Sequence, residues 1–398
     1  MPADRPKIAA IITAFYPLSH ADVLLVKFLK GFPTDDGLIE PRVDVASMFI
    51  DQPNALGRGI GTAVANASNI PLYENVEAAL TLGGKELAVD GVLLIGEHGD
   101  YPENEFGQKL YPRKWLFEQI TAVIARSGKS VPVFSDKHLS YDTQDALWMY
   151  RRAQQLKLPF MAGSSLPLTW RKPFLEVEKG TRIDEAVAIG YGGIEAYTYH
   201  TIEGLQCMVE RRKGGETGVE AVEVLQGADV WQAGESGRWN RDLFDMAVDC
   251  LGAKDNDGTP EEKVKDPVMI EIHHCDGLKA HVFMLSGYAR DWSFAYRSGD
   301  EQHACEFHTQ AGESYAHFSY LGLNVEEMFV TGRPQYPVER TLLVSCVLDA
   351  FMHARKCSTG RAELPDIDIQ YEAPDEVRWR PTGPRPAGAC IEPWVYRW

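Results

Sequence analysis

Long apolar runs are missing from this sequence. No stretch reaches the roughly 18 apolar residues that a membrane-spanning helix requires, so we expect no association with a membrane. The opening residues MPADRPKIAAIITAFYP hold an apolar run of only about six residues with no small-residue cleavage site after it. They therefore do not resemble a secretory signal.

Paired cysteines are also missing. The chain has 7 cysteines, and none stands in a CxxC spacing. Scattered cysteines of odd number are typical of free thiols in a reducing compartment, so we expect the cytoplasm. The histidines beside Cys275 and Cys305 form no paired-ligand motif, and we expect them to serve packing rather than zinc binding. The cysteines are Cys207, Cys250, Cys275, Cys305, Cys346, Cys357 and Cys390.

Basic residues are scarce relative to acidic ones. The 40 lysines and arginines face 57 aspartates and glutamates, which gives a formal net charge of -17. Nucleic acids and anionic membranes select basic surfaces, so neither is an expected partner, although a local basic pocket remains possible. A length of 398 residues predicts two domains, each large enough to bury a core.

The first part of the chain alternates buried strands with amphipathic helices. Apolar runs of strand length begin the segments 7–13, 42–51, 89–96, 130–138 and 158–165, and helical patterns lie between them. This order predicts a doubly wound, parallel, Rossmann-like sheet over residues 1–165.

After residue 165 the residue pattern changes from alternating strands and helices to strand-like segments separated by Gly and Asp-Gly turns, including a tight turn at Asp276-Gly277. We expect strands within 182–192, 218–227, 267–274, 279–288, 292–299, 303–310 and 317–332. The segment 338–356 predicts one strong helix. The fold class is thus α/β, with a second α+β domain over 166–371 on an open, mostly antiparallel sheet, and 372–398 as a wrapping tail.

Glycine is missing from the first turn of the predicted parallel sheet. Such a turn normally carries glycines, because only a backbone without side chains lets a pyrophosphate come close. Here the turn Thr13–Leu18 reads TAFYPL and contains no glycine. Ser19 then opens an S-x-x-D capping pattern, and a helix should run to about Lys30. A dinucleotide, if bound, should meet backbone N–H groups at this helix start.

The densest group of candidate functional residues follows the strand 89–96. The loop GEHGDYPENEFGQKLYPR, residues 96–113, comes directly after a buried strand, and the carboxyl ends of parallel strands are where open α/β sheets bind ligands. We expect it to contact a substrate or cofactor. Glu97, His98 and Asp100 could also bind a divalent metal, but no recognised ligand spacing supports this, so no metal is expected.

Several passages in this order resemble the Gfo/Idh/MocA family, the glucose–fructose oxidoreductases and inositol dehydrogenases. The family's E-K-P at a strand end is similar to Asp136-Lys137-His138, and its D-x-G-x-H-x-x-D segment resembles EAYTYHTIEGLQ. That match puts His200 on the family's histidine and Glu203 near its last acid. The segments 143–173 and 338–365 also resemble family passages. The similarity covers about 7–371, and the glycine fingerprint and the E-K-P glutamate and proline are departures.

The resemblance implies a hydride transfer that uses NAD or NADP. Lys137 would be the proton relay, because a partly desolvated lysine at a strand end can exchange a proton with a hydroxyl group. The implied site residues fall into three sets. The catalytic set is Lys137, His200, His98 and Glu97; the cofactor set is Thr13, Ser19, His20, Asp51, Gly96 and Asp136; the substrate set is Asp100, Tyr101, Tyr111, Arg113 and Arg171.

Three functions stay open from the sequence. The first is an NAD(P)-dependent oxidoreductase acting on a secondary alcohol of a sugar, glycoside or cyclitol derivative. The second is a redox-neutral lyase or hydrolase for a sugar derivative on the same scaffold, with the cofactor lost or tightly retained. The third is a non-catalytic binding protein. By resemblance alone, the protein should form a homodimer or homotetramer.

Overall fold

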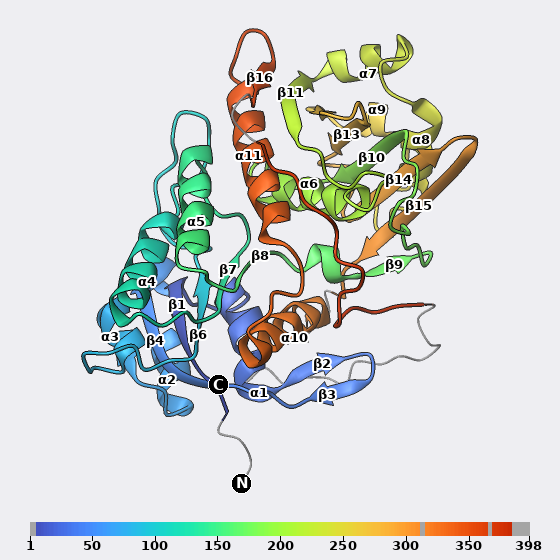
Figure 1. The fold of residues 1–398 in the computed structure, drawn as a ribbon. Coiled ribbons are helices and arrows are strands. Elements are labelled where there is room, and N and C mark those ends of the chain that lie inside the picture. Colours follow the sequence, from blue (N-terminus) through green and yellow to red (C-terminus); the bar gives the residue numbers. More distant parts are fainter. Residues whose placement is uncertain (1–4, 311–314, 365–367, 384–398) are drawn as a thin grey trace.

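The structure, a computed structural model, describes residues 5–310, 315–364 and 368–383. Two β-sheets organise it, one built mainly from the first part of the chain and one from the second (Figure 1). A short antiparallel hairpin, β2 (Phe32–Thr34) with β3 (Gly37–Ile39), stands apart from both sheets. The predicted α/β class with two different sheets is confirmed.

The first sheet has six parallel strands in the order β5-β4-β1-β6-β7-β8. The strand order reverses around β1, as in doubly wound dinucleotide-binding folds. The apolar runs of the sequence fall on its central strands, since both faces are covered. The strands are β1 (Lys7–Ala14), β4 (Asp44–Gln52), β5 (Leu72–Tyr73), β6 (Gly91–Ile95), β7 (Val133–Asp136) and β8 (Phe160–Gly163).

Helices cover both faces of this sheet. Alternate residues of β1 enter different cores: Ile11 joins the core that holds α3, α4 and α5, whereas Ile12 joins the core that holds η1, α2 and α10. The helices are η1 (Ala21–Leu25, a π-helix), α1 (Lys27–Lys30), η2 (Ala55–Gly57), α2 (Gly61–Ala67), α3 (Val76–Thr81), α4 (Arg113–Ser127) and α5 (Thr143–Gln155).

Helix α10 (Ala316–Thr331) corrects the sequence prediction of a strand over 317–332. It packs against η1 and β2, so a segment from late in the chain completes the core of the first sheet (Figure 1). Most of its residues are buried on every side. A helix buried all round shows no one-sided apolar pattern, and its apolar run is therefore hard to distinguish from that of a strand.

The second sheet has eight strands in the order β16-β11-β12-β13-β10-β14-β15-β9. Only the pair β10 and β13 is parallel. The predicted tight turn at Asp276-Gly277 joins β12 to β13, and Gly277 has a positive φ of 83°. The strands are β9 (Trp170–Lys172), β10 (Glu185–Gly190), β11 (Val219–Gln226), β12 (Val268–His274), β13 (Lys279–Met284), β14 (Trp292–Ser298), β15 (Glu301–His308) and β16 (Arg361–Glu363).

Helices lie on both faces of the second sheet as well. On one face, α6 and α11 pack in the large core that continues into the first sheet. On the other face, α7 and α8 form a separate core with Val187, Met269 and Phe283. The remaining helices are η3 (Leu166–Leu168), α6 (Ala196–Val209), α7 (Ala228–Glu235), α8 (Arg241–Asp249), α9 (Pro260–Lys263) and α11 (Val338–Ala354).

The described part of the predicted tail contacts helix α10, which packs on the first sheet, and strand β9 of the second sheet. Arg378 pairs with Glu327 of α10, and Trp170 of β9 donates a hydrogen bond to the Gly383 carbonyl. Residues 384–398, the rest of the predicted wrapping tail, lie outside the described residues. The division into 1–165, 166–371 and 372–398 stays a prediction.

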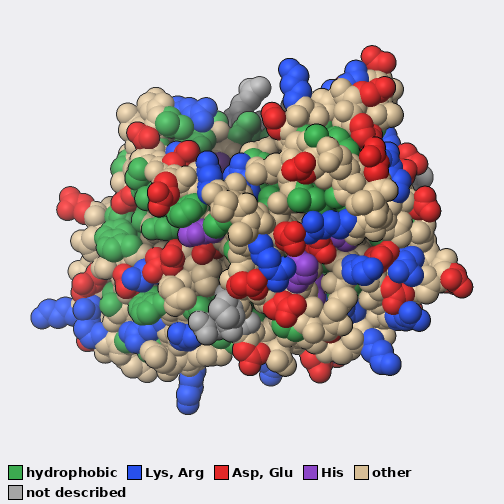
Figure 2. All heavy atoms as spheres, turned by 90° about the horizontal axis from the view of Figure 1, so that it is seen from above, with side chains coloured by type: hydrophobic (Ala, Val, Ile, Leu, Met, Phe, Trp, Pro, Cys, Tyr) green, Lys and Arg blue, Asp and Glu red, His purple; other side chains and the backbone are tan. Residues whose placement is uncertain are grey.

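Three properties of the described residues bear on partners. Six cysteines are free thiols, while Cys390 lies outside the described residues. Acidic and basic side chains are interspersed over the face drawn in Figure 2. Within the described residues, no helix combines the length and the apolar character needed to cross a membrane.

Candidate active site

A cavity of about 430 Å³ lies where the carboxyl ends of the parallel strands meet the second sheet. This volume is in the range that holds a small-molecule ligand. Polar and aromatic side chains from both parts of the chain line it. They include His20, Glu97, His98, Tyr111, Lys137, Ser165, Tyr191, Tyr197, His200, Trp292, His317 and Phe318.

The cavity brings together the residues that the sequence marks as catalytic. Glu97 and His98 follow β6, Lys137 follows β7, and His200 comes from α6. Strand ends of a parallel sheet share one edge, which explains why residues 40 positions apart converge there. The expectation that Lys137, His200 and the loop after β6 face one cleft agrees with this geometry; their roles stay a prediction.

A buried ion cluster forms the floor of the cavity. Lys137 Nζ donates to Glu97 Oε1 at 3.1 Å, and the Arg113 guanidinium donates to Glu97 Oε2. Burial alone would raise the pKa of Glu97, but Lys137 and Arg113 outweigh it and hold that pKa well below its usual value. One carboxylate therefore pairs with two basic side chains in this cluster.

Arg113 supports this cluster from behind and does not line the cavity. Its Nη1 lies 3.0 Å from His138 Nε2, and burial, followed by the charge of Arg113, lowers the pKa of His138 well below its usual value. A Cβ on Gly96 would stand 2.6 Å from Arg113 Cγ, so a glycine is required for the close approach of this side chain. Gly96, predicted to contact a cofactor, thus has a structural reason for its identity.

His200 belongs to a second hydrogen-bonded chain. Its Nδ1 lies 3.0 Å from Ser164 Oγ, and that hydroxyl donates to the carboxylate of Glu203. Tyr199 donates to the other oxygen of Glu203 at 3.1 Å. Burial, followed by the charge of Lys137, lowers the pKa of His200 well below its usual value. His200 is therefore a neutral imidazole held in one orientation.

His20 and Asp136 form a third pair. His20 Nδ1 lies 2.6 Å from Asp136 Oδ2, and Asp136 is fully buried at the end of β7. The His20 ring meets the rings of His98 and Phe318 edge-on, with centroids 5.2 and 5.1 Å away. The sequence assigns both residues to cofactor binding, but the structure joins them to each other at the cavity.

Aromatic rings form the opposite wall of the cavity. Tyr197 stacks on Trp292 with centroids 5.6 Å apart and an interplanar angle of 15°. Tyr191 lies 4.8 Å from the same indole ring, and His200 meets it edge-on. Flat apolar faces of this kind suit the C–H faces of a sugar or cyclitol ring.

No model of a known protein family matches the chain, and no curated protein sequence does so either. Solved structures do match over most of its length. GenD2 from gentamicin A biosynthesis, in complex with NAD, aligns with 90% of this chain and 96% of its own at 14% identity and a TM-score of 0.56. Myo-inositol dehydrogenase from Lactobacillus casei, in complex with NAD(H) and myo-inositol, aligns with 91% and 98% at 8% identity and a TM-score of 0.56. Apo scyllo-inositol dehydrogenase from the same organism aligns with 89% and 96% at 10% identity and a TM-score of 0.54.

The chain has the fold of these dehydrogenases. The resemblance expected from the sequence is thereby confirmed for the fold. At these identities the individual site residues must be judged on this chain's own geometry.

In dinucleotide-binding folds, the turn after the first strand offers backbone N–H groups to the pyrophosphate. In this chain the corresponding turn is the one after β1. The Leu18 N–H donates to Asp22 Oδ2 at 2.7 Å, and the Tyr16 N–H donates to Ser19 Oγ at 3.2 Å. Phe15 is fully buried. Two N–H groups of this turn are thus bonded to the chain's own side chains, and that of Ser19 is bonded to the Tyr16 carbonyl, so none of these three is available to a pyrophosphate and the turn does not fit that group in this arrangement.

Thr13 has a different use from the predicted cofactor contact. Its hydroxyl is buried and donates to the Glu97 carbonyl at 2.7 Å. The turn after β1 is thereby tied to the loop after β6. Thr13 and Ser19 both serve the local structure of this edge rather than presenting donors to a ligand.

The loop after β6 also crosses the carboxyl end of β1. Tyr101 donates to Asp51 Oδ2 at 2.6 Å, and the Asp100 N–H donates to Gln52 Oε1 at 2.7 Å. Asp51 and Gln52 end β4, which flanks β1 on the other side from β6. Asp51, Asp100 and Tyr101 therefore form a bridge over the point where such sheets bind ligands.

A second cavity, of about 720 Å³, opens beside this bridge. Asp51, Tyr73 and Trp115 are among its lining residues, and Lys137 and His200 are not. The predicted ribose-binding position of Asp51 thus faces a cavity separate from the catalytic candidates.

Arg171, predicted to contact substrate, does not line the cavity at Lys137. It is buried in β9, where its guanidinium donates to the carbonyls of Thr169 and Pro167 and lies over the Phe307 ring. It holds the connection between the two sheets. The sequence could not distinguish this role, because a charge beside a predicted cleft can point to either side of its strand.

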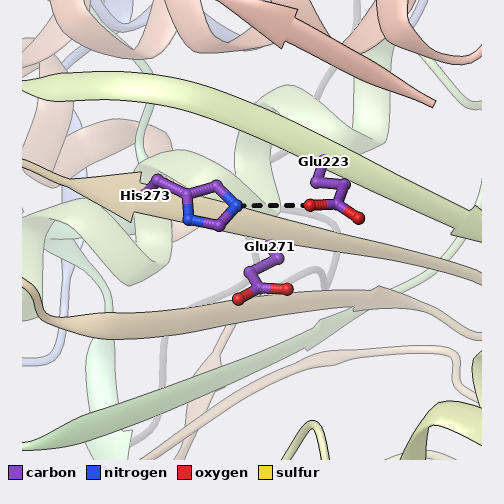
Figure 3. A group of neighbouring side chains, drawn as sticks. All are labelled: Glu223, Glu271 and His273. Carbon is purple, nitrogen blue, oxygen red and sulfur yellow. Dashed lines mark ion pairs between the residues drawn. The ribbon is translucent and has the colours of Figure 1, made fainter. Parts of the chain in front are cut away.

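One group of three metal-ligating residues occurs among the described residues, on the second sheet: Glu223, Glu271 and His273 (Figure 3). His273 Nε2 lies 3.6 Å from Glu223 Oε2. Arg238 bridges both carboxylates at 2.6 and 2.7 Å, and Arg361 Nη1 lies 3.7 Å from Glu223 Oε2, so two arginines balance the two carboxylates. The group is best described as an ion-pair network.

The sequence analysis missed several residues of the site. Ser165 lines the cavity and Ser164 holds His200, and both follow β8, so the same strand-end rule that identified residues 96–113 would have found them. Tyr191, Tyr197 and Trp292 carry no such signal, because only the second sheet's packing brings them to the cavity.

Proposed function

We propose that the chain is an enzyme of the Gfo/Idh/MocA type, acting as an oxidoreductase on a hydroxyl-bearing carbon of a sugar, glycoside or cyclitol derivative in the cavity at Lys137. The shared fold supports the reaction class. The observation that carries the proposal is the buried pair of Lys137 and Glu97 at the strand ends, facing an aromatic wall. A cavity with a few convergent polar groups and shifted pKa values is the usual setting for acid–base chemistry.

Each group in the cavity has a role in this proposal. Lys137 donates to the reacting oxygen of the substrate and stabilises the negative charge that develops there, with Glu97 as its counter-ion. His200, held through Ser164, orients the same hydroxyl group. Tyr197 and Trp292 bind the apolar face of the ring.

The fold favours NAD or NADP as the hydride acceptor, but the turn after β1 does not fit its pyrophosphate. We expect two lost charge-assisted hydrogen bonds, each worth about 1.5–3 kcal/mol, to weaken binding by about 10²–10⁴-fold. The bridge at Asp51 would also have to open. No role for this chain's residues is therefore assigned through the cofactor.

The turn favours a second candidate function. A redox-neutral lyase or hydrolase for the same substrate class would use the cavity unchanged and would need no dinucleotide. Both candidates place the same acid–base groups on the substrate and differ in the fate of the hydrogen on the reacting carbon.

Two measurements separate the candidates. Mass spectrometry of the denatured purified protein shows whether a nicotinamide cofactor copurifies, and calorimetry with NAD(H) and NADP(H) measures binding. Cofactor retention, or saturation with oxidation of a polyol, supports the oxidoreductase. No cofactor and no saturation at millimolar concentrations, in a folded protein, favours the redox-neutral candidate.

A panel of cyclitols and methyl glycosides, tested with and without cofactor, then probes the site itself. Lys137→Met should abolish turnover of any active compound, whereas Lys129→Met, on an exposed loop, should leave it unchanged. Equal activity in both variants would refute the assignment of the site.

The cellular setting follows from the thiols. We infer a reducing compartment such as the cytoplasm, because six free cysteines persist most readily there. A homodimer or homotetramer is inferred from the resemblance. Since α7 and α8 cover part of one face of the second sheet, such an assembly would have to use another surface or only part of that face.

A further inference from the structure

Four histidines line the cavity at Lys137, and they differ in what holds them. His200 is bonded to Ser164 and His317 to the Gln310 carbonyl, whereas the Nε2 of His98 is buried with no hydrogen-bond partner among the described residues. Burial is the main reason that the pKa of His98 falls to about 4 and that of His317 to about 3. His20 alone among the four is bonded to a carboxylate.

Asp136 forms its side-chain hydrogen bond with His20. The carboxylate is fully buried, and its Oδ1 has no hydrogen-bond partner among the described residues. Its Oδ2 lies 2.6 Å from His20 Nδ1. A buried carboxylate is retained only where it is paired or hydrogen-bonded, so this contact accounts for its presence at the end of β7.

The contact decides which nitrogen of His20 can act. A carboxylate accepts the Nδ1–H, which leaves Nε2 as the basic nitrogen on the far side of the ring. The ring lines the cavity, and the edges of His98 and Phe318 hold its plane. The same arrangement of a buried carboxylate behind an imidazole sets the tautomer and stabilises the imidazolium in hydrolase triads.

We propose that His20 is the general base of the site and that Asp136 is its positioning residue. This inference rests on the proposed function. Nε2 accepts the proton of the substrate hydroxyl: the O–H bond breaks, its electron pair stays on oxygen, and the N–H bond forms. The imidazolium then faces the Asp136 carboxylate, while Lys137 donates to the oxygen that has become negative.

The charged and titratable neighbours of His20 support this division of roles. Lys137 is already a donor to Glu97, and His98 is a weak base because burial lowers its pKa. His200 is likewise a weak base. The assignment also explains why Asp136 and His20, 116 positions apart in the chain, contact each other at the cavity.

The pair is tested first without any substrate. In the full chain labelled with ¹⁵N-histidine, long-range proton–nitrogen correlations report the tautomer of each imidazole, and His20→Gln identifies the His20 signals. We expect His20 to carry its proton on Nδ1 at neutral or mildly basic pH. In Asp136→Asn the amide can donate to Nδ1, and the proton should move to Nε2. A wild-type Nε2–H tautomer would overturn the inference, even if the Asn variant fails to fold.

Kinetics test the role of the base. With whichever compound of the cyclitol and glycoside panel is turned over, Asp136→Asn should lower kcat by about 10²–10⁴-fold with little change in KM, because the tautomer is wrong. His20→Gln should lose a similar factor, and the double variant should lose no more. The half-buried His303 and the exposed Asp229 do not line the cavity, so His303→Gln and Asp229→Asn serve as controls.

The outcomes separate the two proposals. A His20→Gln variant that keeps kcat within threefold of wild type would exclude His20 as the base, whatever the tautomer. An inactive panel would count against the proposed function alone, and the tautomer measurement would still decide whether the pair exists.

Discussion

Two neighbouring parts of the carboxyl end of the parallel sheet, the turn after β1 and the loops after β6 and β7, use their polar side chains in opposite ways. After β1, the turn has satisfied its own N–H groups with Ser19 and Asp22 and has buried Phe15. After β6 and β7, the chain instead places a lysine, an arginine and a glutamate together in a buried cluster that borders a cavity. The strand order is that of a dinucleotide-binding sheet at both edges.

The difference shows that two proteins can share a fold while their functional side chains lie at the ends of different strands. At β1 the side chains stabilise the turn itself, whereas at β6 and β7 they hold charges that local stability alone would not require. Burying two basic side chains around one carboxylate is costly, and removing one partner of such a group is strongly destabilising. We infer that the charged groups after β6 and β7 serve the candidate site together with His20, whereas Thr13, Phe15 and Ser19 of the turn after β1 support the structure.

The largest effect should come from removing the carboxylate of the charged cluster. Glu97→Ala leaves the buried Lys137 and Arg113 without their shared counter-charge, and breaking a buried pair in this way costs about 3–5 kcal/mol. We expect the free energy of unfolding in urea to fall by about that amount.

A matched control exists in the same loop. Glu103 pairs with Lys109 at 3.2 Å, but its side chain is 60% exposed. Glu103→Ala should change stability by about 0–1 kcal/mol, as is usual for exposed pairs. Similar losses in the two variants would show that the Glu97 cluster is no more than a surface-like ion pair, and the comparison of the edges would fail.

The charged edge should also make the protein acid-sensitive. The folded pKa of His98 is lowered to about 4, mainly by burial, so the unfolded chain binds more protons between pH 6.5 and 4. The pKa of Glu97 is held well below its usual 4.5, so its contribution is present above that value and is lost as pH falls through the folded pKa. Both groups therefore favour unfolding as the pH decreases.

Urea unfolding at several pH values measures this. His98→Gln should reduce the slope between pH 6.5 and 4 by up to about 1.4 kcal/mol per pH unit. The slopes due to the other buried histidines of this site and to Glu97 should remain. His303→Gln, whose histidine is half-buried on β15, should leave the slope unchanged. An unchanged slope in His98→Gln would mean that His98 is solvated rather than buried at this edge.

Much of the fold followed from local sequence signals. Continuous apolar runs identified the central parallel strands, because a strand covered on both faces needs apolar residues at every position. Gly128 follows the last residue of α4 with a positive φ of 66°, the conformation in which glycine commonly ends a helix. Helix α10 was misread, since a helix buried all round lacks the polar face that would reveal its period.

The residues of the candidate site also fall into those that a local sequence signal indicates and those that only the packing of distant segments brings together. Glu97, His98 and Lys137 were predictable, because the rule that ligands bind at strand ends needs only the order of strands. The pairing of His20 with Asp136 was not, since each residue alone has an ordinary local explanation, a helix start and a strand end. The aromatic wall depends on how the second sheet packs, which no short segment encodes.

The bridge between the two edges should have an intermediate effect. Tyr101→Phe removes the hydrogen bond from the phenol to Asp51 while keeping the ring. Hydrogen bonds to charged groups are worth about 1.5–3 kcal/mol, and partial exposure of this pair places the expected loss near the lower limit. Urea unfolding checks the loss. Tyr73→Phe is the control, because within the described residues the Tyr73 hydroxyl takes no part in the hydrogen bond to Asp51. A loss below experimental error would show that the loop after β6 is not held over β1.

The smallest effect should come from the turn itself. Ser19→Ala removes the hydroxyl that accepts from the Tyr16 and Asp22 N–H groups, and losing such hydrogen bonds costs about 1 kcal/mol. It also frees those N–H groups, so it tests whether the turn is an anion site blocked only by its own serine. We expect the affinity for NAD(H), measured by calorimetry, to rise less than about tenfold, which corresponds to about 1.4 kcal/mol. The Leu18 N–H stays bonded to Asp22. A gain of 100-fold or more would mean that one hydroxyl group holds this anion site closed, and the turn after β1 would then belong to the functional site together with His20 and the residues after β6 and β7.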